Sequence, residues 1–257
     1  MNTKYGIIFS GQGSQFVGMG KDIIEKQPHA NVVFALAETI TGIPIKKICL
    51  EDPNEELNLT INSQLAIFLV EAIIFDLFTK SVSILPTVTA GHSLGEYGAL
   101  YCAGVWGNIT NAVRIVHARA KRHQEAFALD VGAMMVIIGA TFENINQVCA
   151  EISHDGFVAE IANINSAKQI VISGHKEAVL AVGTKTKDSF NARTIFLPIN
   201  VPCHSSLMKN AAELFATDLA TSVVYEPQIP VISNCDPSQL HCVNMTKELL
   251  MRQMISP

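Results

Sequence analysis

One serine in this sequence lies in a pattern that is typical of nucleophiles. The segment Gly91-His92-Ser93-Leu94-Gly95 matches G-x-S-x-G, follows an apolar stretch at 87–90 and precedes a predicted helix that begins at Glu96. In this strand-turn-helix context the serine hydroxyl is exposed, and the flanking glycines tolerate the sharp turn. The amide of Leu94, at the helix start, points to where an oxyanion would form. The context favours a nucleophilic Ser93 over an accidental serine in a turn.

A nucleophilic serine needs a base, and His204 is the candidate. It follows Asn200-Val201-Pro202-Cys203, where the chain should re-cross a crevice between two predicted domains. From spacing alone, a structural histidine is an equally good interpretation. The other histidines fit less well: we expect His29, His154 and His241 in polar, exposed stretches, His117, His123 and His175 on or at helices, and a His92 side chain that diverges from Ser93.

The sequence has no acidic residue that is clearly placed to orient His204. In an α/β-hydrolase, this acid lies between the serine and the histidine in the chain. Here most of that interval holds elements predicted in the order β-α-β-β-α-β, with strands at about 133–140, 157–164, 169–173 and 193–199. That order is typical of a ferredoxin-like unit, so the pattern argues against the ordinary hydrolase arrangement.

The remaining elements predict a parallel α/β sheet that would position the serine. An apolar strand at 5–9 ends in the turn Gly11-Gln12-Gly13, and a strand-turn-helix order is typical of such sheets. Helices are expected at about 31–41, 62–79 and 110–127, with a short helix capped by Asp52-Pro53. We therefore predict an α/β fold with a larger domain (1–128 and 200–257), an inserted smaller domain (129–199) and a ligand site in the crevice between them.

Composition excludes several other classes of protein. Of the 257 residues, 49% are hydrophobic and 16% are charged, which suits a compact enzyme with a buried core. A net charge of -5 without a basic run argues against a nucleic-acid partner. The six cysteines form no CxxC pair, which favours free thiols in a reducing cytoplasm and no metal site. The apolar run at 65–78 is too short to span a bilayer, and the N-terminal stretch is too short for a signal peptide, so no membrane is expected.

Several segments together resemble one family, the malonyl-CoA:acyl carrier protein transacylases, which include free-standing acyltransferases of polyketide synthases. They occur in order along essentially the whole chain, and as a set they are far more specific than G-x-S-x-G alone. The matching segments are Phe9-Ser10-Gly11-Gln12-Gly13-Ser14-Gln15, Gly91-His92-Ser93-Leu94-Gly95-Glu96-Tyr97, Val113-Arg114-Ile115-Val116 running into Arg119, Gly132-Ala133-Met134, Asn163-Ile164-Asn165-Ser166 and Val201-Pro202-Cys203-His204.

The resemblance implies a ping-pong transfer of a malonyl group. Ser93, deprotonated by His204, would attack the thioester of malonyl-CoA, and the phosphopantetheine thiol of an acyl carrier protein would then take the acyl group. The backbone amides of Gln12 and Leu94 would form the oxyanion hole. Gln64, His92 and Asn163 would line the substrate site. The family has an α/β-hydrolase-like domain with an inserted ferredoxin-like domain, needs no bound cofactor and uses a coenzyme A thioester as its substrate, in fatty acid or polyketide synthesis.

Arg119 is the residue on which substrate choice depends. It falls on the apolar stripe that Ala112, Ile115 and Val116 mark on the predicted helix, and a cation that faces the interior needs a partner. The resemblance implies that Arg119 grips the malonyl carboxylate as a bidentate pair. The alternative is an arginine whose stem packs while its head reaches water or a structural acid. Lys121, Arg122 and Lys209 are a candidate docking surface for the carrier protein.

The sequence departs from the family near its end. It stops at Pro257, where family members continue for several dozen residues, and we expect those residues to supply the carbonyl that orients the histidine, together with a closing strand and helix. A truncated chain, a split protein and a natural variant with impaired activity all fit this departure. Cys203 also stands where relatives often carry a serine or another small residue.

Two other functions remain open from the sequence. An acyl hydrolase on the same scaffold would use Ser93 and His204 but would have no need for Arg119. A non-catalytic module that docks carrier proteins would need none of these residues, and their intact set opposes it. A general esterase is less favoured, because no acid lies in the usual place.

Overall fold

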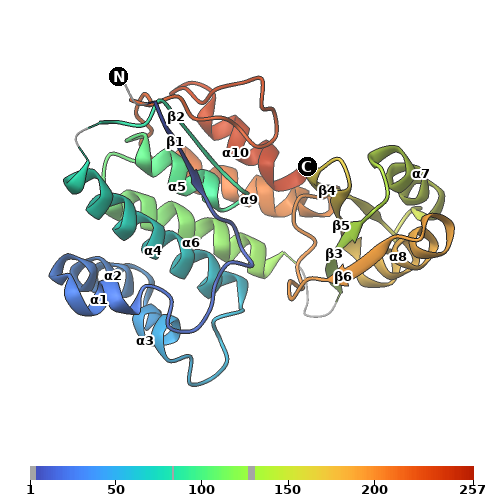
Figure 1. Ribbon diagram of the computed structural model, residues 1–257, viewed down its shortest axis with the longest axis horizontal. Helices are drawn as coiled ribbons and strands as arrows, with labels where there is room; N and C mark the ends of the chain where they lie inside the picture. Colours follow the sequence, from blue (N-terminus) through green and yellow to red (C-terminus); the bar gives the residue numbers. More distant parts are fainter. Residues whose placement is uncertain (1–3, 83, 127–130) are drawn as a thin grey trace. The chain divides into compact units, whose positions relative to one another are not determined.

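The computed structural model describes residues 4–82, 84–126 and 131–257, and the chain divides into two compact units (Figure 1). The first unit comprises 1–121 and 216–249, and the second comprises 122–215 and 250–257. Each unit therefore takes its residues from two separate stretches of the chain.

The first unit contains the predicted parallel sheet. Strands β1 (Gly6–Phe9) and β2 (Val88–Gly91) pair in parallel, with Gly6 opposite Val88 and Phe9 opposite Gly91. Residues 230–232 extend the sheet along β2, because the Thr89 amide donates to Pro230 O (2.9 Å) and the Ile232 amide donates to Thr89 O (3.0 Å). The carboxyl ends of all three segments lie at the same edge, where ligands bind in open α/β sheets.

Helices build the core of the first unit around this sheet. Helix α4 (Thr60–Ser81) and helix α5 (Gly95–Cys102) run beside the strands in Figure 1, and α6 (Ile109–Glu125) follows. The predictions for α4 and α6 are confirmed, although residue 127, the predicted end of α6, lies outside the described residues. Three further helices are α1 (Lys21–Lys26), α2 (Pro28–Thr41) and α3 (Ile45–Leu50).

Helix α4 is a core helix. Among the described residues it is the one helix that is long and apolar enough to cross a membrane by length and composition, yet 56% of its most apolar window is buried inside the protein. It also carries Glu71 and Asp76, and Asp76 receives hydrogen bonds from Tyr101 Oη and pairs with His29 Nε2 at 3.0 Å. Packing against the rest of the unit therefore accounts for its apolar character.

The prediction of a short helix that begins at Asp52-Pro53 is wrong. Helix α3 ends at Leu50, and the residues that follow form turns instead. Asp52 and Glu55 have φ values of 41° and 58°, a left-handed backbone that a right-handed helix cannot continue through. Asp52 Oδ1 accepts hydrogen bonds from the amides of Glu56 (2.7 Å) and Leu57 (3.0 Å), so this carboxylate caps a turn rather than a helix.

The second unit has a four-stranded antiparallel sheet in the order β4-β5-β3-β6. The chain order β-α-β-β-α-β is confirmed, and helices α7 and α8 pack against the sheet around one apolar core that includes Met135, Ile145 and Val182. Helices α9 (Lys209–Ala220) and α10 (Thr246–Ile255) come later in the chain. The elements of the sheet and its two helices are β3 (Gly132–Ile138), α7 (Phe142–Ile152), β4 (Ala159–Ser166), β5 (Gln169–His175), α8 (Lys176–Phe190) and β6 (Arg193–Phe196).

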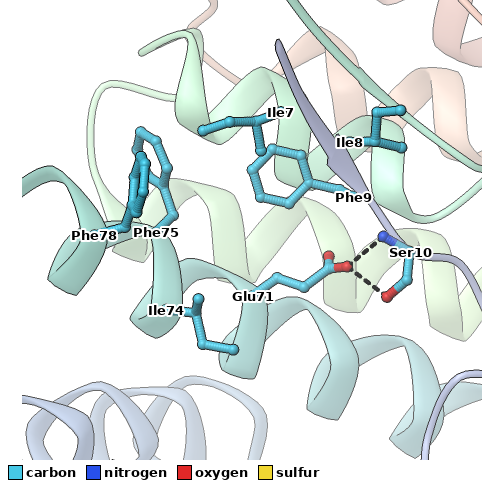
Figure 2. Close-up of a pocket in the computed structure, with 8 residues that line it drawn as sticks. All are labelled: Ile7, Ile8, Phe9, Ser10, Glu71, Ile74, Phe75 and Phe78. Atoms are coloured by element: carbon cyan, nitrogen blue, oxygen red, sulfur yellow. Dashed lines mark hydrogen bonds between the residues drawn. The ribbon is translucent and has the colours of Figure 1, made fainter. Parts of the chain in front are cut away.

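A groove of about 370 Å³ lies between β1 and α4 (Figure 2). Within the described chain β1 pairs with a strand on one side only, and Ile8 at this place is 83% exposed. The lining is mostly apolar and contains none of the predicted site residues. It consists of Ile7, Ile8, Phe9, Ser10, Glu71, Ile74, Phe75 and Phe78.

Glu71 is the one ionisable side chain in this groove. Its Oε1 accepts hydrogen bonds from the amide (2.7 Å) and the hydroxyl (2.8 Å) of Ser10, which Figure 2 shows as dashed lines. Its Oε2 is buried and has no hydrogen-bond partner among the described residues. Burial raises the pKa of Glu71 to about 7, although the two bonds from Ser10 act in the opposite direction.

Glu71 should therefore make the protein less stable as the pH rises. Above the ordinary pKa of glutamate the unfolded chain loses its proton while the folded chain keeps it, until the pH passes about 7. The resulting loss of unfolding free energy reaches at most about 3 kcal/mol. We expect Glu71→Gln, which stays neutral, to gain stability over the wild type between about pH 5 and about pH 8, measured by denaturant unfolding. Glu25→Gln, at an exposed position, is the control; an advantage of Glu71→Gln that does not change with pH would contradict the prediction.

Candidate active site

The turn that carries Ser93 has room for glycine alone at two positions. A Cβ atom on Gly91 would lie 1.9 Å from the carbonyl carbon of Gly95, and one on Gly95 would lie 2.3 Å from Phe9 O. The backbone of Ser93 is left-handed, with φ of 51°. The close contacts explain the two flanking glycines of G-x-S-x-G, and a strained backbone at a non-glycine residue is typical of functional sites.

Arg119 lies against Ser93 within the first unit. Its side chain is 1% exposed, its Nη2 donates to Ser93 Oγ (3.1 Å), and its Nη1 donates to Gln64 Oε1 (2.6 Å). The guanidinium carbon is 5.1 Å from the centroid of the Tyr97 ring, which stacks on Trp106. Burial raises the pKa of Tyr97 above its ordinary value, which keeps the ring neutral beside the cation.

Gln64 and Gln12 extend this network to the loop after β1. Gln64 Nε2 donates to Gln12 Oε1 (3.2 Å), and Gln12 Nε2 donates to Thr60 Oγ1 (3.3 Å). Four side chains that are far apart in the sequence are thus joined in the order Gln12, Gln64, Arg119 and Ser93. The network fixes both ends of the Gln64 carboxamide, so its oxygen faces the guanidinium.

The backbone donors around Ser93 are not equivalent. The Ser93 amide donates to Asn234 Oδ1 (2.6 Å), so it is already engaged. Leu94 is buried and directly precedes helix α5, where backbone amides point out of the helix start. His92 is exposed, and its amide donates to Phe9 O (3.0 Å). Leu94 is therefore the better-placed oxyanion donor of the turn.

His204 is held by the end of helix α10 within the second unit. It is 4% exposed and has φ of 59°, its Nδ1 lies 2.7 Å from Gln253 O, and its amide donates to Met254 O (3.1 Å). Carbonyls in the last turn of a helix lack partners inside the helix, and the residue four positions after Gln253 is Pro257, which has no N–H. A bond from Nδ1–H to Gln253 O leaves Nε2 as the proton acceptor.

The expectation that the orienting carbonyl lies beyond Pro257 is therefore wrong. Gln253 supplies it from within this chain. The physical reason is that α10 ends at Ile255, so its last carbonyls fall beside His204. The sequence carried a signal for this: a proline four residues after Gln253 ensures that the Gln253 carbonyl accepts no α-helical hydrogen bond.

The predicted site residues fall into both units. The first unit brings together Ser93, Arg119, Gln64 and Gln12, with His92 and Leu94 in the same turn as Ser93. The second unit contains His204 and also Asn163, which is half-buried on β4 beside a register shift between Ile161 and Asn163.

Two features around the nucleophile turn were missed by the sequence interpretation. His241, expected to be exposed, is 4% exposed, and its Nε2 lies 2.6 Å from Glu96 Oε1, because the buried carboxylate needs a polar partner. Asn234 contacts the turn directly. The apolar run at 230–232, followed by Ser233-Asn234, is the signal that could have located a third strand end beside Ser93.

Comparisons with known proteins agree with this geometry. Residues 7–257 match the family described as acyl transferase domain. The chain is 38% identical over 255 residues to the malonyl CoA-acyl carrier protein transacylase of Escherichia coli (strain K12), covering 99% of this chain and 82% of the relative. For the enzyme of that name from Bacillus subtilis (strain 168) the identity is 36%, with 99% and 80% covered.

Solved structures give the same result. The chain matches the structure of a malonyl-transacylase in complex with its type II PKS acyl-carrier protein with a TM-score of 0.93 and 36% identity, covering 99% of this chain and 82% of that chain. It matches an acyl carrier protein S-malonyltransferase from Vibrio cholerae with a TM-score of 0.91 and 39% identity, covering 99% and 83%. The chain therefore belongs to the acyl transferase domain family that contains the malonyl CoA-acyl carrier protein transacylases.

Proposed function

We propose that this chain transfers a malonyl group from malonyl-CoA to the phosphopantetheine thiol of an acyl carrier protein, through an acyl-enzyme on Ser93. The observation that carries the proposal is the buried Arg119 guanidinium, whose Nη2 lies 3.1 Å from Ser93 Oγ. A cation at that place suits an acyl group that carries its own carboxylate. The relatives' names and the neighbour in complex with an acyl-carrier protein support the donor and the acceptor.

The same proposal includes the finer architecture and the setting. We infer an α/β-hydrolase-like domain of 1–128 and 200–257, with an inserted ferredoxin-like domain of 129–199. The antiparallel order β4-β5-β3-β6 supports the second assignment. The reaction needs no bound cofactor beyond the coenzyme A thioester, and we expect it to occur in the cytoplasm, in fatty acid or polyketide synthesis.

In the first half-reaction, Ser93 Oγ attacks the thioester carbonyl carbon while His204 Nε2 takes the hydroxyl proton. The carbonyl oxygen becomes an oxyanion, which the amides of Leu94 and Gln12 stabilise. Collapse of this intermediate breaks the C–S bond, and the imidazolium returns its proton to the departing sulfur. Gln253 O, which accepts from Nδ1–H, keeps the ring in the required tautomer.

The second half-reaction repeats these steps with a different thiol. His204 removes the proton of the phosphopantetheine thiol, whose sulfur attacks the ester carbonyl of malonyl-Ser93. The C–O bond to Ser93 breaks and the serine hydroxyl regains its proton. Arg119, which Gln64 Oε1 orients, holds the malonyl carboxylate throughout, so the carbonyl presented to the incoming thiol does not move away from Ser93.

The first prediction from this mechanism concerns the acyl-enzyme. Incubation with malonyl-CoA should add one malonyl group to the chain, on the peptide that contains Ser93, because Ser93 is the nucleophile. Intact-mass and peptide mass spectrometry measure this adduct, and Ser93→Ala should abolish it. If the wild-type chain takes no adduct, or keeps it when Ser93 is replaced, the proposed mechanism is wrong.

The fate of the adduct separates transfer from hydrolysis. Addition of a carrier protein with a phosphopantetheine arm should remove the malonyl group from Ser93 and place it on the carrier. An acyl hydrolase would instead release free malonate at the same rate with and without the carrier. A docking module would bind the carrier but form no adduct.

The second prediction concerns selectivity. Arg119→Ala should lower the rate of malonylation about 10²- to 10³-fold, as expected for the loss of one partner of a buried charged pair, at about 2–5 kcal/mol. Acetylation from acetyl-CoA, which needs no counter-charge, should fall far less, so the malonyl-to-acetyl ratio drops. Arg114→Ala, an exposed arginine on the same helix, is the control. Equal losses for both donors would contradict the assigned role of Arg119.

The third prediction concerns the carrier. Lys121 and Lys209 are exposed, and Arg122 Nη1 lies 3.5 Å from Glu125 Oε2. If these cations meet an acidic carrier, replacing them with glutamate should raise the carrier KM without changing malonylation by malonyl-CoA. Charge reversal that leaves carrier turnover unchanged would remove this surface from consideration.

A further inference from the structure

Asn234 touches the nucleophile turn at two backbone groups. Its side-chain Oδ1 accepts from the Ser93 amide at 2.6 Å, and its Nδ2 donates to Gly91 O at 2.6 Å. These groups flank His92, so one carboxamide spans the corner of the turn. Asn234 lies just beyond residues 230–232, the segment that pairs with β2, so the neighbouring strand end supplies this contact.

The chemistry of the contact requires an amide or its isostere. One end must accept from an N–H and the other must donate to a C=O, and a carboxamide does both in a single plane. An ionised aspartate has acceptors only and would repel Gly91 O. An alanine would leave the 2.6 Å contacts at both Gly91 and Ser93 unmade.

A network of hydrogen bonds through Glu96 and His241 fixes the backbone of Asn234. Its backbone amide donates to Glu96 Oε1 (3.1 Å), and the same oxygen lies 2.6 Å from His241 Nε2. His241 Nδ1 is 3.3 Å from Thr246 Oγ1, and the side chains of Glu96 and His241 are fully buried. A buried polar cluster therefore sets the position of Asn234.

We propose that Asn234 is a positioning residue, which holds the Ser93 turn in its left-handed form and occupies the Ser93 amide. The first effect keeps Ser93 Oγ at the 3.1 Å distance from Arg119 Nη2. The second leaves the oxyanion to the amide of Leu94 instead of the nucleophile's own amide. This inference rests on the proposed role of Ser93, and it adds a residue that the mechanism above does not use.

The test compares Asn234→Ala with Asn244→Ala, an exposed asparagine ten residues further along. We expect Asn234→Ala to lower the rate constant of malonyl-Ser93 formation about 10- to 100-fold, because a displaced nucleophile loses its near-attack geometry. The half-saturating malonyl-CoA concentration should stay within about twofold, since Arg119 still binds the carboxylate. Asn244→Ala should behave as the wild type, and a folded Asn234→Ala that acylates at the wild-type rate would overturn the proposal.

Asn234→Asp tests the contact through the pH dependence of the acylation rate, which a merely structural role of Asn234 would not change. A protonated aspartic acid accepts from the Ser93 amide and donates to Gly91 O, as asparagine does, whereas the ionised form cannot. The ratio of Asp-variant to wild-type acylation should therefore rise as the pH falls. The titratable groups that face this position, Glu96 and His241, are present in both proteins, and a Glu96 carboxylate beside the new carboxyl would favour its protonated form. A ratio that is independent of pH would count against the proposed contact.

A second measurement does not depend on catalysis. In ¹⁵N-labelled protein, hydrogen exchange of the Ser93 amide should be faster in Asn234→Ala than in the wild type, while Asn244→Ala leaves it unchanged. If the wild type forms no acyl-enzyme, the proposed function fails, and the exchange rate alone decides whether Asn234 holds the turn. Unchanged exchange in Asn234→Ala would show that it does not.

Discussion

The close approach of the backbone at Gly91 and Gly95 is the constraint on which the first unit's reactive groups depend. Because Gly95 packs directly against Phe9 O, the serine turn and the loop after β1 are pressed together. That contact brings Gln12 near enough to reach Gln64, and Gln64 near enough to reach Arg119. A side chain at Gly95 would push α5 away from the end of β1, and one at Gly91 would collide with Gly95 inside the turn. Either change would disturb a network whose members come from four separate segments.

Holding His204 with a carbonyl instead of a carboxylate has a physical consequence. Gln253 O fixes the ring tautomer as an acid would, but it carries only a partial charge. The negative end of the α10 dipole adds to this, because two last-turn carbonyls of the same helix face His204. In the proposed mechanism, these carbonyls would stabilise positive charge on the ring during proton transfer without a second ionisable group.

The sequence predicted elements better than it predicted contacts. Long periodic or apolar segments such as α4, and the β-α-β-β-α-β order of the second unit, follow from local pattern and were found as expected. Glycine spacing located the serine turn for the same reason. The Asp52 turn was mistaken for a helix because a capping carboxylate and a proline occur in both. Asn234, Glu96 and His241 were missed because their partners lie about 140 residues away in the chain, and no local pattern reports such pairs.

The environment of Arg119 bears on why an acyl chain with a carboxylate would be preferred. Burying the guanidinium costs desolvation, and Gln64, Ser93 and Tyr97 contribute dipoles and a ring face that offset part of that cost. A malonyl carboxylate offsets that cost by adding a full counter-charge in the planar geometry that arginine matches and lysine does not. An acetyl group fits the same space but brings no counter-charge. Discrimination between malonyl and acetyl groups would then depend on whether the acyl group pairs with the buried guanidinium. A site that pairs a buried polar group discriminates between substrates more strongly than a site that distinguishes them by size alone.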